Sequence, residues 1–143
     1  MEKEFILDEN EFDVVIFADI LEHLYNPPEC IKKFMKYLKP EGYFILSIPN
    51  VANWYVRFNL LLGNFDYESS GILDETHIRF FTFKSVVAML NKAGLKIEKV
   101  NTTYNINIPL LSRFSIFRRL IAFITRLNKN LLARQFIVIA VLK

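Results

Sequence analysis

The chain has 143 residues, of which 52% are apolar, so it is long enough for one domain and apolar enough for a core. Its formal net charge of +3 is too small to indicate nucleic-acid binding, and we expect no nucleic-acid partner. The single cysteine, Cys30, excludes an internal disulfide and a cysteine-based zinc site, and it favours a reduced, cytoplasmic location.

The stretch Phe12–Leu24 combines a strand pattern with a cluster of ionisable residues. Its apolar run Val14–Ala18 predicts a strand buried on both faces, and Asp19, Glu22 and His23 follow it directly. In open α/β sheets, ligands bind beyond the carboxyl ends of the strands, which is where this cluster would lie. A solvated turn without a function is the alternative interpretation of the same pattern.

A helix and a second strand follow this cluster. Asn26 and Glu29 predict a capped helix start, with Pro27 at the first helical position. The sequence Lys-Pro-Glu-Gly at residues 39–42 predicts the end of that helix. The apolar run Tyr43–Ile48 then predicts a second buried strand.

Residues 51–81 form a long connection that is rich in aromatic residues. Such a connection in a compact domain is more often a substrate or lid loop than a spacer. We expect a short helix near Trp54–Leu62, which Gly63 would end.

The remaining part of the core pattern contains one helix and two strands. Thr82 predicts a helix cap, and Gly94 predicts the end of that helix. Leu95–Thr103 is predicted as a strand, and the continuous apolar run Phe136–Leu142 as a buried strand.

A basic amphipathic helix is predicted at about residues 113–132. Its apolar residues form one stripe at helical spacing, and the basic residues on the other side are Arg118, Arg119, Arg126 and Lys129. This helix could cover the sheet with a solvated basic face, or it could contact an anionic membrane surface or substrate. No apolar run reaches the roughly 18–20 residues that span a bilayer, so peripheral contact is the membrane role considered.

Several stretches share their order and spacing with one enzyme family. They are Phe12-Asp13-Val14-Val15-Ile16, Leu21-Glu22-His23-Leu24, Leu38-Lys39-Pro40-Glu41-Gly42, Ser47-Ile48-Pro49-Asn50 and His77-Ile78-Arg79-Phe80-Phe81-Thr82. Together they resemble class I S-adenosylmethionine-dependent methyltransferases. The resemblance implies an α/β fold with a partial Rossmann-like methyltransferase sheet, strands four to seven with the final strand antiparallel, and flanking helices.

The resemblance also indicates which part of the methyltransferase domain is present. That fold begins with a Gly-x-Gly turn and an acidic residue that holds the cofactor ribose, whereas the glycines here are far apart: Gly42, Gly63, Gly71 and Gly94. We therefore expect residues 1–143 to be the C-terminal portion of a truncated domain. Alone, the chain should bind the cofactor weakly or not at all.

The resemblance implies S-adenosyl-L-methionine as the methyl donor. Phe17, Ala18 and Asp19 are expected beside its methionine part. Methyl transfer depends mainly on positioning, with a general base needed when the acceptor is a hydroxyl or an amine. The expected acceptor is an oxygen or nitrogen of a small molecule or glycan-like compound.

His23 and His77 are the candidate bases, because they are the only histidines and their ordinary pKa suits proton transfer near neutral pH. Each has a structural alternative. His23 could pack at a helix start, and His77 could form a hydrogen bond with Asp74 or Glu75.

Asn50, Trp54 and Arg79 are expected to contact the acceptor. For Arg79, an anionic group of the acceptor and a carboxylate of its own loop are equally suitable partners. The choice between them is open at the level of the sequence.

A metal site is also predicted. If Asp19 opens a helical turn, then Asp19, Glu22 and His23 lie on one face of it. The spacing resembles the acidic-x-x-Glu-His stretch of ubiquinone-pathway O-methyltransferases, in which these positions look like Mg²⁺ ligands. Such an ion would lower the pKa of an acceptor hydroxyl, although many methyltransferases carry Glu-His here without a metal.

Three functions remain open as alternatives. The chain could be part of a methyltransferase, a non-catalytic remnant or partner subunit that completes another chain's sheet, or a membrane-surface interaction module. Without preceding strands, Val14–Ala18 would form an exposed edge. We therefore expect self-association or a complementing N-terminal half.

Overall fold

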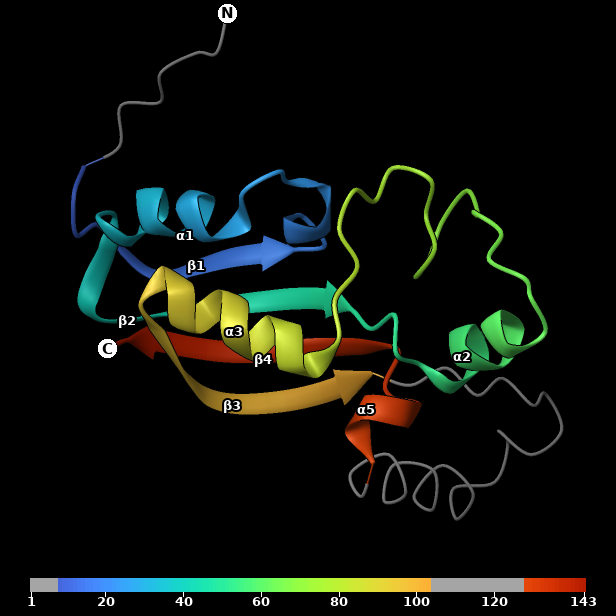
Figure 1. Ribbon diagram of the computed structural model, residues 1–143. Helices are drawn as coiled ribbons and strands as arrows, with labels where there is room; N and C mark the ends of the chain where they lie inside the picture. Colours follow the sequence, from blue (N-terminus) through green and yellow to red (C-terminus); the bar gives the residue numbers. More distant parts are fainter. Residues whose placement is uncertain (1–7, 104–127) are drawn as a thin grey trace, which may run out of the picture.

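The computed structural model describes residues 8–103 and 128–143, which form a sheet with helices around it (Figure 1). The helices and strands, in chain order, are β1 (Phe12–Ala18), η1 (Leu21–His23), α1 (Pro27–Met35), β2 (Leu38–Pro49), α2 (Trp54–Leu61), α3 (Phe83–Ala93), β3 (Leu95–Thr103), α5 (Lys129–Leu132) and β4 (Gln135–Leu142). The element η1 is a short 3₁₀ helix.

The four strands lie in the order β1-β2-β4-β3. β1 and β2 are parallel, and the last strand, β4, runs antiparallel to both β2 and β3. This arrangement confirms the predicted partial Rossmann-like sheet with a final antiparallel strand. The carboxyl ends of β1, β2 and β3 therefore lie at the same edge as the amino end of β4, so residues distant in sequence meet there (Figure 1).

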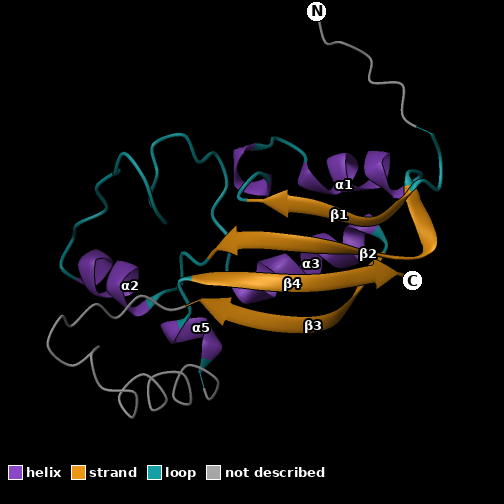
Figure 2. Ribbon diagram, turned by 180° about the vertical axis from the view of Figure 1, so that it is seen from behind, coloured by secondary structure: helices purple, strands orange, loops and turns teal. Residues whose placement is uncertain are grey.

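The core lies between the sheet and two helices, α1 and α3, which cover the same face (Figures 1 and 2). Alternate residues of the strands point into this layer, so one set is fully buried and includes Phe44, Leu46, Phe136 and Val138. The alternate residues lie on the opposite face, where Ile16 is 60% exposed. The prediction that Val14–Ala18 is buried on both faces is therefore wrong, because α1 and α3 cover only one of them.

The start of α1 was predicted correctly, but its cap was not. The helix begins at Pro27, as expected, yet the Asn26 side chain forms no capping hydrogen bond. Pro27 and Pro28 have no backbone N–H, which removes donors that a capping side chain would accept from. Glu29 pairs instead with Lys32, at 3.0 Å, so the predicted capping box is absent.

β2 begins earlier than predicted, at Leu38 rather than Tyr43. Residues 39–42, expected to end the preceding helix, belong to this strand, and an irregularity in its pairing with β1 accommodates them. Gly42 allows the close approach that this path requires, because a Cβ atom there would lie only 2.7 Å from the Leu38 side chain. The helix itself ends at Met35.

The elements between residues 54 and 103 follow local signals closely. Thr82 and Ser85 form a reciprocal capping box at the start of α3, and Gly94 ends that helix with φ 90°. α2 ends before Gly63, which has φ 82°. β3 has the predicted bounds, Leu95–Thr103.

Most of the basic amphipathic helix predicted at about residues 113–132 lies outside the described residues. Within that range, the described element is the short helix α5, Lys129–Leu132. Among the described residues, no helix has the length and apolar character needed to cross a bilayer. The predicted membrane role of residues 113–132 therefore stays a prediction.

Candidate functional site

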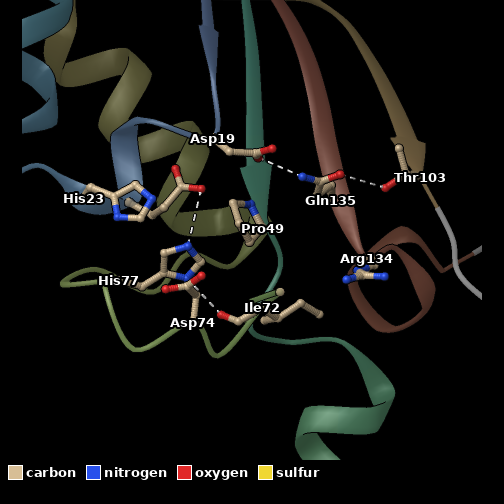
Figure 3. Close-up of a pocket in the computed structure, with 11 residues that line it drawn as sticks. Asp19, His23, Pro49, Ile72, Asp74, His77, Thr103, Arg134 and Gln135 are labelled. Carbon is tan, nitrogen blue, oxygen red and sulfur yellow. Dashed lines mark hydrogen bonds and ion pairs between the residues drawn. The ribbon is translucent and has the colours of Figure 1, made fainter. Parts of the chain in front are cut away.

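A cavity of about 500 Å³ lies at the edge where β1, β2 and β3 end and β4 begins (Figure 3). Residues from these strands, from η1 and from the loop before α3 form its walls. They are Asp19, Glu22, His23, Pro49, Gly71, Ile72, Asp74, His77, Thr103, Arg134 and Gln135. The polar end of the Phe12–Leu24 stretch therefore does lie beyond a strand end, in a pocket.

Asp19 follows the last residue of β1 in a left-handed conformation, with φ 51°. Its Oδ1 accepts hydrogen bonds from Ser47 Oγ, at 2.8 Å, and from Gln135 Nε2, at 2.7 Å. Thr103 Oγ1 donates to Gln135 Oε1, at 3.3 Å, so one chain of polar groups crosses the edge of the whole sheet (Figure 3). The expectation that Asp19 opens a helical turn is wrong, because η1 begins only at Leu21.

Of the residues predicted to lie beside the cofactor, Asp19 lines the cavity, whereas the side chain of Phe17 lies in the core. The Phe17 side chain is 4% exposed and stacks on Phe44 in the core, so it cannot contact a ligand in the cavity. Ala18 is exposed at the end of β1. A ligand at this edge would therefore meet the backbone of β1 and the Asp19 carboxylate.

Glu22 lies on η1 and is 1% exposed. Its backbone carbonyl accepts hydrogen bonds from the N–H groups of Ile78 and Arg79, which fastens η1 to the loop before α3. Its two carboxylate oxygens, in contrast, are buried and have no hydrogen-bond partner among the described residues. Burial, assisted by the charge of Asp19, raises the pKa of the Glu22 carboxyl above its ordinary value.

The rings of His23 and His77 contact each other, with centroids 4.8 Å apart (Figure 3), and His77 Nε2 lies 3.8 Å from Oε1 of this buried carboxylate. The Nδ1 atom of His23 lies 3.1 Å from the Thr76 carbonyl, and that of His77 lies 3.1 Å from the Ile72 carbonyl. A carbonyl accepts only, so each Nδ1 carries the proton and each neutral ring has its lone pair on Nε2. The His77 side chain thus bonds a backbone carbonyl and not the carboxylate of Asp74 or Glu75.

The side chain of Asn50 is fully buried and is used within the protein. Its Nδ2 donates to the carbonyls of Asn130, at 3.0 Å, and Ala133, at 2.8 Å, and its Oδ1 accepts from the Ala52 N–H, at 3.0 Å. Asn53 donates to Ala133 as well, at 2.9 Å. These bonds join the end of β2 to the segment before β4, so Asn50 shapes the cavity from behind and does not reach into it.

Arg79 also has partners that were not predicted. Its guanidinium donates to the backbone carbonyls of Leu24, at 3.0 Å, and Tyr25. Neither partner is a carboxylate of its own loop, and both belong to the chain that follows η1. Arg79 therefore fixes the loop before α3 onto the chain that follows η1.

Trp54 lies away from this cavity, at a second one of about 290 Å³. Its side chain is 44% exposed, and Tyr55 and Val56 of α2 line the same cavity. Arg134 and Ile72 line both cavities, so the two hollows are neighbours.

Several residues that line the main cavity were not predicted, among them Thr103, Arg134 and Gln135. They lie at the end of β3 and at the start of β4. The antiparallel course of the last strand brings its first residue to the carboxyl edge of the parallel strands, so the predicted strand order contained a signal for them.

Comparisons with known proteins agree with this fold. A family model described as a methyltransferase domain matches residues 2–100. No curated protein matches the sequence. Among solved structures, a SAM-dependent methyltransferase from Archaeoglobus fulgidus is 19% identical with a TM-score of 0.58, over 96% of this chain and 62% of that one.

Two further structures have the same fold. A SAM-dependent methyltransferase from Methanosarcina mazei is 16% identical with a TM-score of 0.59, over 98% of this chain and 64% of its own. The trans-methyltransferase CalH, solved in complex with SAH, is 17% identical with a TM-score of 0.54, over 96% of this chain and 32% of its own. The chain thus spans less than two thirds of each structure, and by its family match it belongs to the methyltransferase-domain family.

Proposed function

We propose that this chain takes part in S-adenosylmethionine-dependent methyl transfer to an oxygen or nitrogen acceptor, and that the transfer takes place at the main cavity. The observation that carries the proposal is the pair of imidazoles facing a buried carboxylate at the carboxyl edge of the sheet. The family match and the similar structures named as SAM-dependent methyltransferases support the choice of donor.

The residues present offer one side of a cofactor site. The end of β1 exposes Ala18, and the carboxylate of Asp19 is held in place by Ser47 and Gln135. S-adenosylmethionine, when bound, supplies a sulfonium methyl group that an acceptor can attack. No two glycines of this chain form a Gly-x-Gly turn, so we propose that a segment outside it supplies the remaining contacts.

His23 and His77 are proposed to activate the acceptor. An acceptor hydroxyl or amine loses its proton to the unprotonated Nε2 of one imidazole while its lone pair forms the new bond to the methyl carbon. With the donor bound, the bond from that carbon to sulfur would break and its electron pair would stay on sulfur. His23 is exposed and within reach of the cavity, whereas His77 is 8% exposed and lies closest to Glu22.

The acceptor is proposed to be a small molecule or glycan-like compound, and the ubiquinone-pathway type of O-methyl transfer is the subgroup proposed. Support comes from the loop at residues 51–81, which borders both cavities. Its exposed apolar and aromatic residues, Trp54, Tyr55 and Phe58, could cover a bound acceptor. This loop is accordingly proposed as a lid.

A second proposal concerns assembly. β1 is an outer strand of the sheet, and its Ile16 side chain is 60% exposed on the face away from α1 and α3. Among residues 8–103 and 128–143, no strand pairs with the outer edge of β1. Such an edge, next to exposed apolar side chains, favours pairing with another strand. We propose that a second copy or a complementing N-terminal half covers this edge.

Labelled methyl transfer tests the enzymatic proposal. The longest natural protein that contains this chain is incubated with methyl-labelled S-adenosylmethionine and fractionated metabolite extract, and label in small molecules is counted. His23→Asn and His77→Asn should each lower incorporation by roughly 10²–10⁴-fold, the usual size of acid–base contributions. Glu98→Gln, at an exposed position of β3 outside both cavities and the proposed lid, is the matched control. Equal incorporation in all four proteins would contradict the proposal.

A further inference from the structure

The sharpest feature of the main cavity is the meeting of Glu22, His23 and His77. One potential ligand atom of each side chain lies within 4.8 Å of the others. The closest approach recorded between them is 3.8 Å, between His77 Nε2 and Glu22 Oε1. That distance is too long for a hydrogen bond, but at this distance the two side chains are in van der Waals contact.

The two imidazoles are already oriented as metal-binding histidines are. Such histidines donate the N–H of one ring nitrogen to a carbonyl or carboxylate and bind the ion through the other nitrogen. Here His23 donates to the Thr76 carbonyl and His77 to the Ile72 carbonyl, each at 3.1 Å. Both Nε2 lone pairs are therefore free for an ion.

The Glu22 carboxylate gives independent evidence for a missing ligand. It is 1% exposed, and neither of its oxygens has a hydrogen-bond partner among residues 8–103 and 128–143. An ionised carboxylate buried without a partner is strongly unfavourable. A cation bound at its oxygens would remove that cost.

The donor set decides which ion fits. Mg²⁺ prefers six oxygen ligands, whereas two imidazole nitrogens and one carboxylate suit divalent transition metals. Asp19, which the sequence pattern placed in an Mg²⁺ site, does not belong to this cluster and shares its Oδ1 with Ser47 and Gln135. The described residues therefore do not fit the expected Mg²⁺ site.

We propose that Glu22, His23 and His77 bind one divalent first-row transition-metal ion, such as zinc, at the inner wall of the cavity. At bond lengths of about 2.0–2.1 Å, tetrahedral ligand atoms lie about 3.4 Å apart, so the cluster contracts by about 1.4 Å at its widest. Three protein ligands leave a position open toward the cavity. There the ion would lower the pKa of an acceptor hydroxyl. In the metal-bound protein this would replace proton transfer to an imidazole, because both Nε2 atoms are then ligands of the ion. This role rests on the proposed methyl transfer, whereas binding of the ion does not.

Metal titration tests the site without any measurement of activity. The chain is freed of metal with EDTA and titrated with Co²⁺, whose visible absorption reports its ligands, and Zn²⁺ is then added in competition. We expect one equivalent to bind, without thiolate-to-cobalt absorption from Cys30. Millimolar Mg²⁺ should not displace the bound Co²⁺.

Variants identify the ligands. Glu22→Gln, His23→Gln and His77→Gln should each weaken Co²⁺ binding by about tenfold or more, the least that a change in a metal site commonly costs. Asp19→Asn should leave the affinity within about threefold, because its carboxylate is outside the cluster. His23 is exposed, so its variant keeps the test valid if a variant at a buried position fails to fold.

The outcomes separate the two proposals. No binding of Co²⁺ or Zn²⁺, or binding that none of the three variants weakens, would overturn the metal site. Binding that these variants weaken, with methyl transfer unaffected by chelation, would support the site and overturn its role in the reaction. Loss of label transfer on chelation, restored by Zn²⁺, would support both.

Discussion

Asn50 and Glu22 lie near the same edge of the sheet and are 0% and 1% exposed, yet their polar atoms have opposite surroundings. The Asn50 amide makes three hydrogen bonds, two of which connect the chain at the end of β2 to the segment before β4. The Glu22 carboxylate makes none within the described residues. Buried polar groups normally have hydrogen-bond partners. The arrangement of Asn50 is therefore typical of a structural residue, whereas that of Glu22 is typical of a ligand-binding site.

Removing the hydrogen bonds of Asn50 should have the largest effect on stability. Asn50→Ala leaves the Asn130 carbonyl and the Ala52 N–H without their side-chain partner and removes one of two amide donors from the Ala133 carbonyl. We therefore expect the free energy of unfolding to fall by about 2–4 kcal/mol. Denaturant unfolding followed by circular dichroism measures this. Asn101→Ala, at an exposed position of β3, is the matched control and should change stability by less than about 0.5 kcal/mol.

Removing the charge of Glu22 should instead increase the stability of the metal-free protein. Glu22→Gln keeps the shape but cannot ionise, so in EDTA and at neutral pH we expect a gain of about 1 kcal/mol in unfolding free energy. A loss of several kcal/mol in metal-free solution would show that the carboxylate is a structural group, as Asn50 is.

The difference in stability between Glu22→Gln and the unsubstituted protein should depend on pH, and the direction follows from the pKa of Glu22. The pKa of Glu22 is raised above the ordinary value of 4.5, mainly by burial, so the folded state holds this proton more tightly than the unfolded state. The contribution of Glu22 to stability is therefore full below pH 4.5 and is lost as the pH rises through the raised pKa. We expect the advantage of Glu22→Gln to be greatest above that window and to vanish below it. Unfolding curves across that range measure it.

Asp19 is intermediate between the two cases and should give the smallest effect. It lies at the same edge, but one of its oxygens accepts from both Ser47 and Gln135. Ser47→Ala removes one of two donors to an accessible group, so stability should fall by less than about 1 kcal/mol. A fall as large as that of Asn50→Ala would mean that the row of hydrogen-bonded side chains across the strand ends is a main source of the stability of the fold.

Local signals explain which parts of the fold were predictable. The caps of α3 at Thr82 and Gly94, the bounds of β3 and the end of α2 before Gly63 all depend on neighbouring residues, and these predictions are confirmed. The burial of β1 could not be predicted, because it depends on which face the helices cover. The same holds for the start of β2, which is set by the contact of Gly42 with Leu38.

The site was predictable only in part for the same reason. The sequence places Glu22 and His23 at a strand end, but His77 joins them through a loop more than fifty residues later, where Glu22 O accepts from Ile78 and Arg79. The part played by Asn50 depends on Asn130 and Ala133, about eighty residues away. Such contacts are a property of the fold and leave no trace in local spacing.

Hydrogen exchange with and without S-adenosylmethionine tests the central claim, that the main cavity at the strand ends receives the donor. The measurement uses the longest natural protein that contains this chain. We expect slower exchange on ligand addition for amides of residues 18–23 and 72–79, and unchanged exchange for residues 95–100 of β3, far from the cavity. Unchanged exchange at both cavity segments, in a protein that binds the ligand, would contradict it.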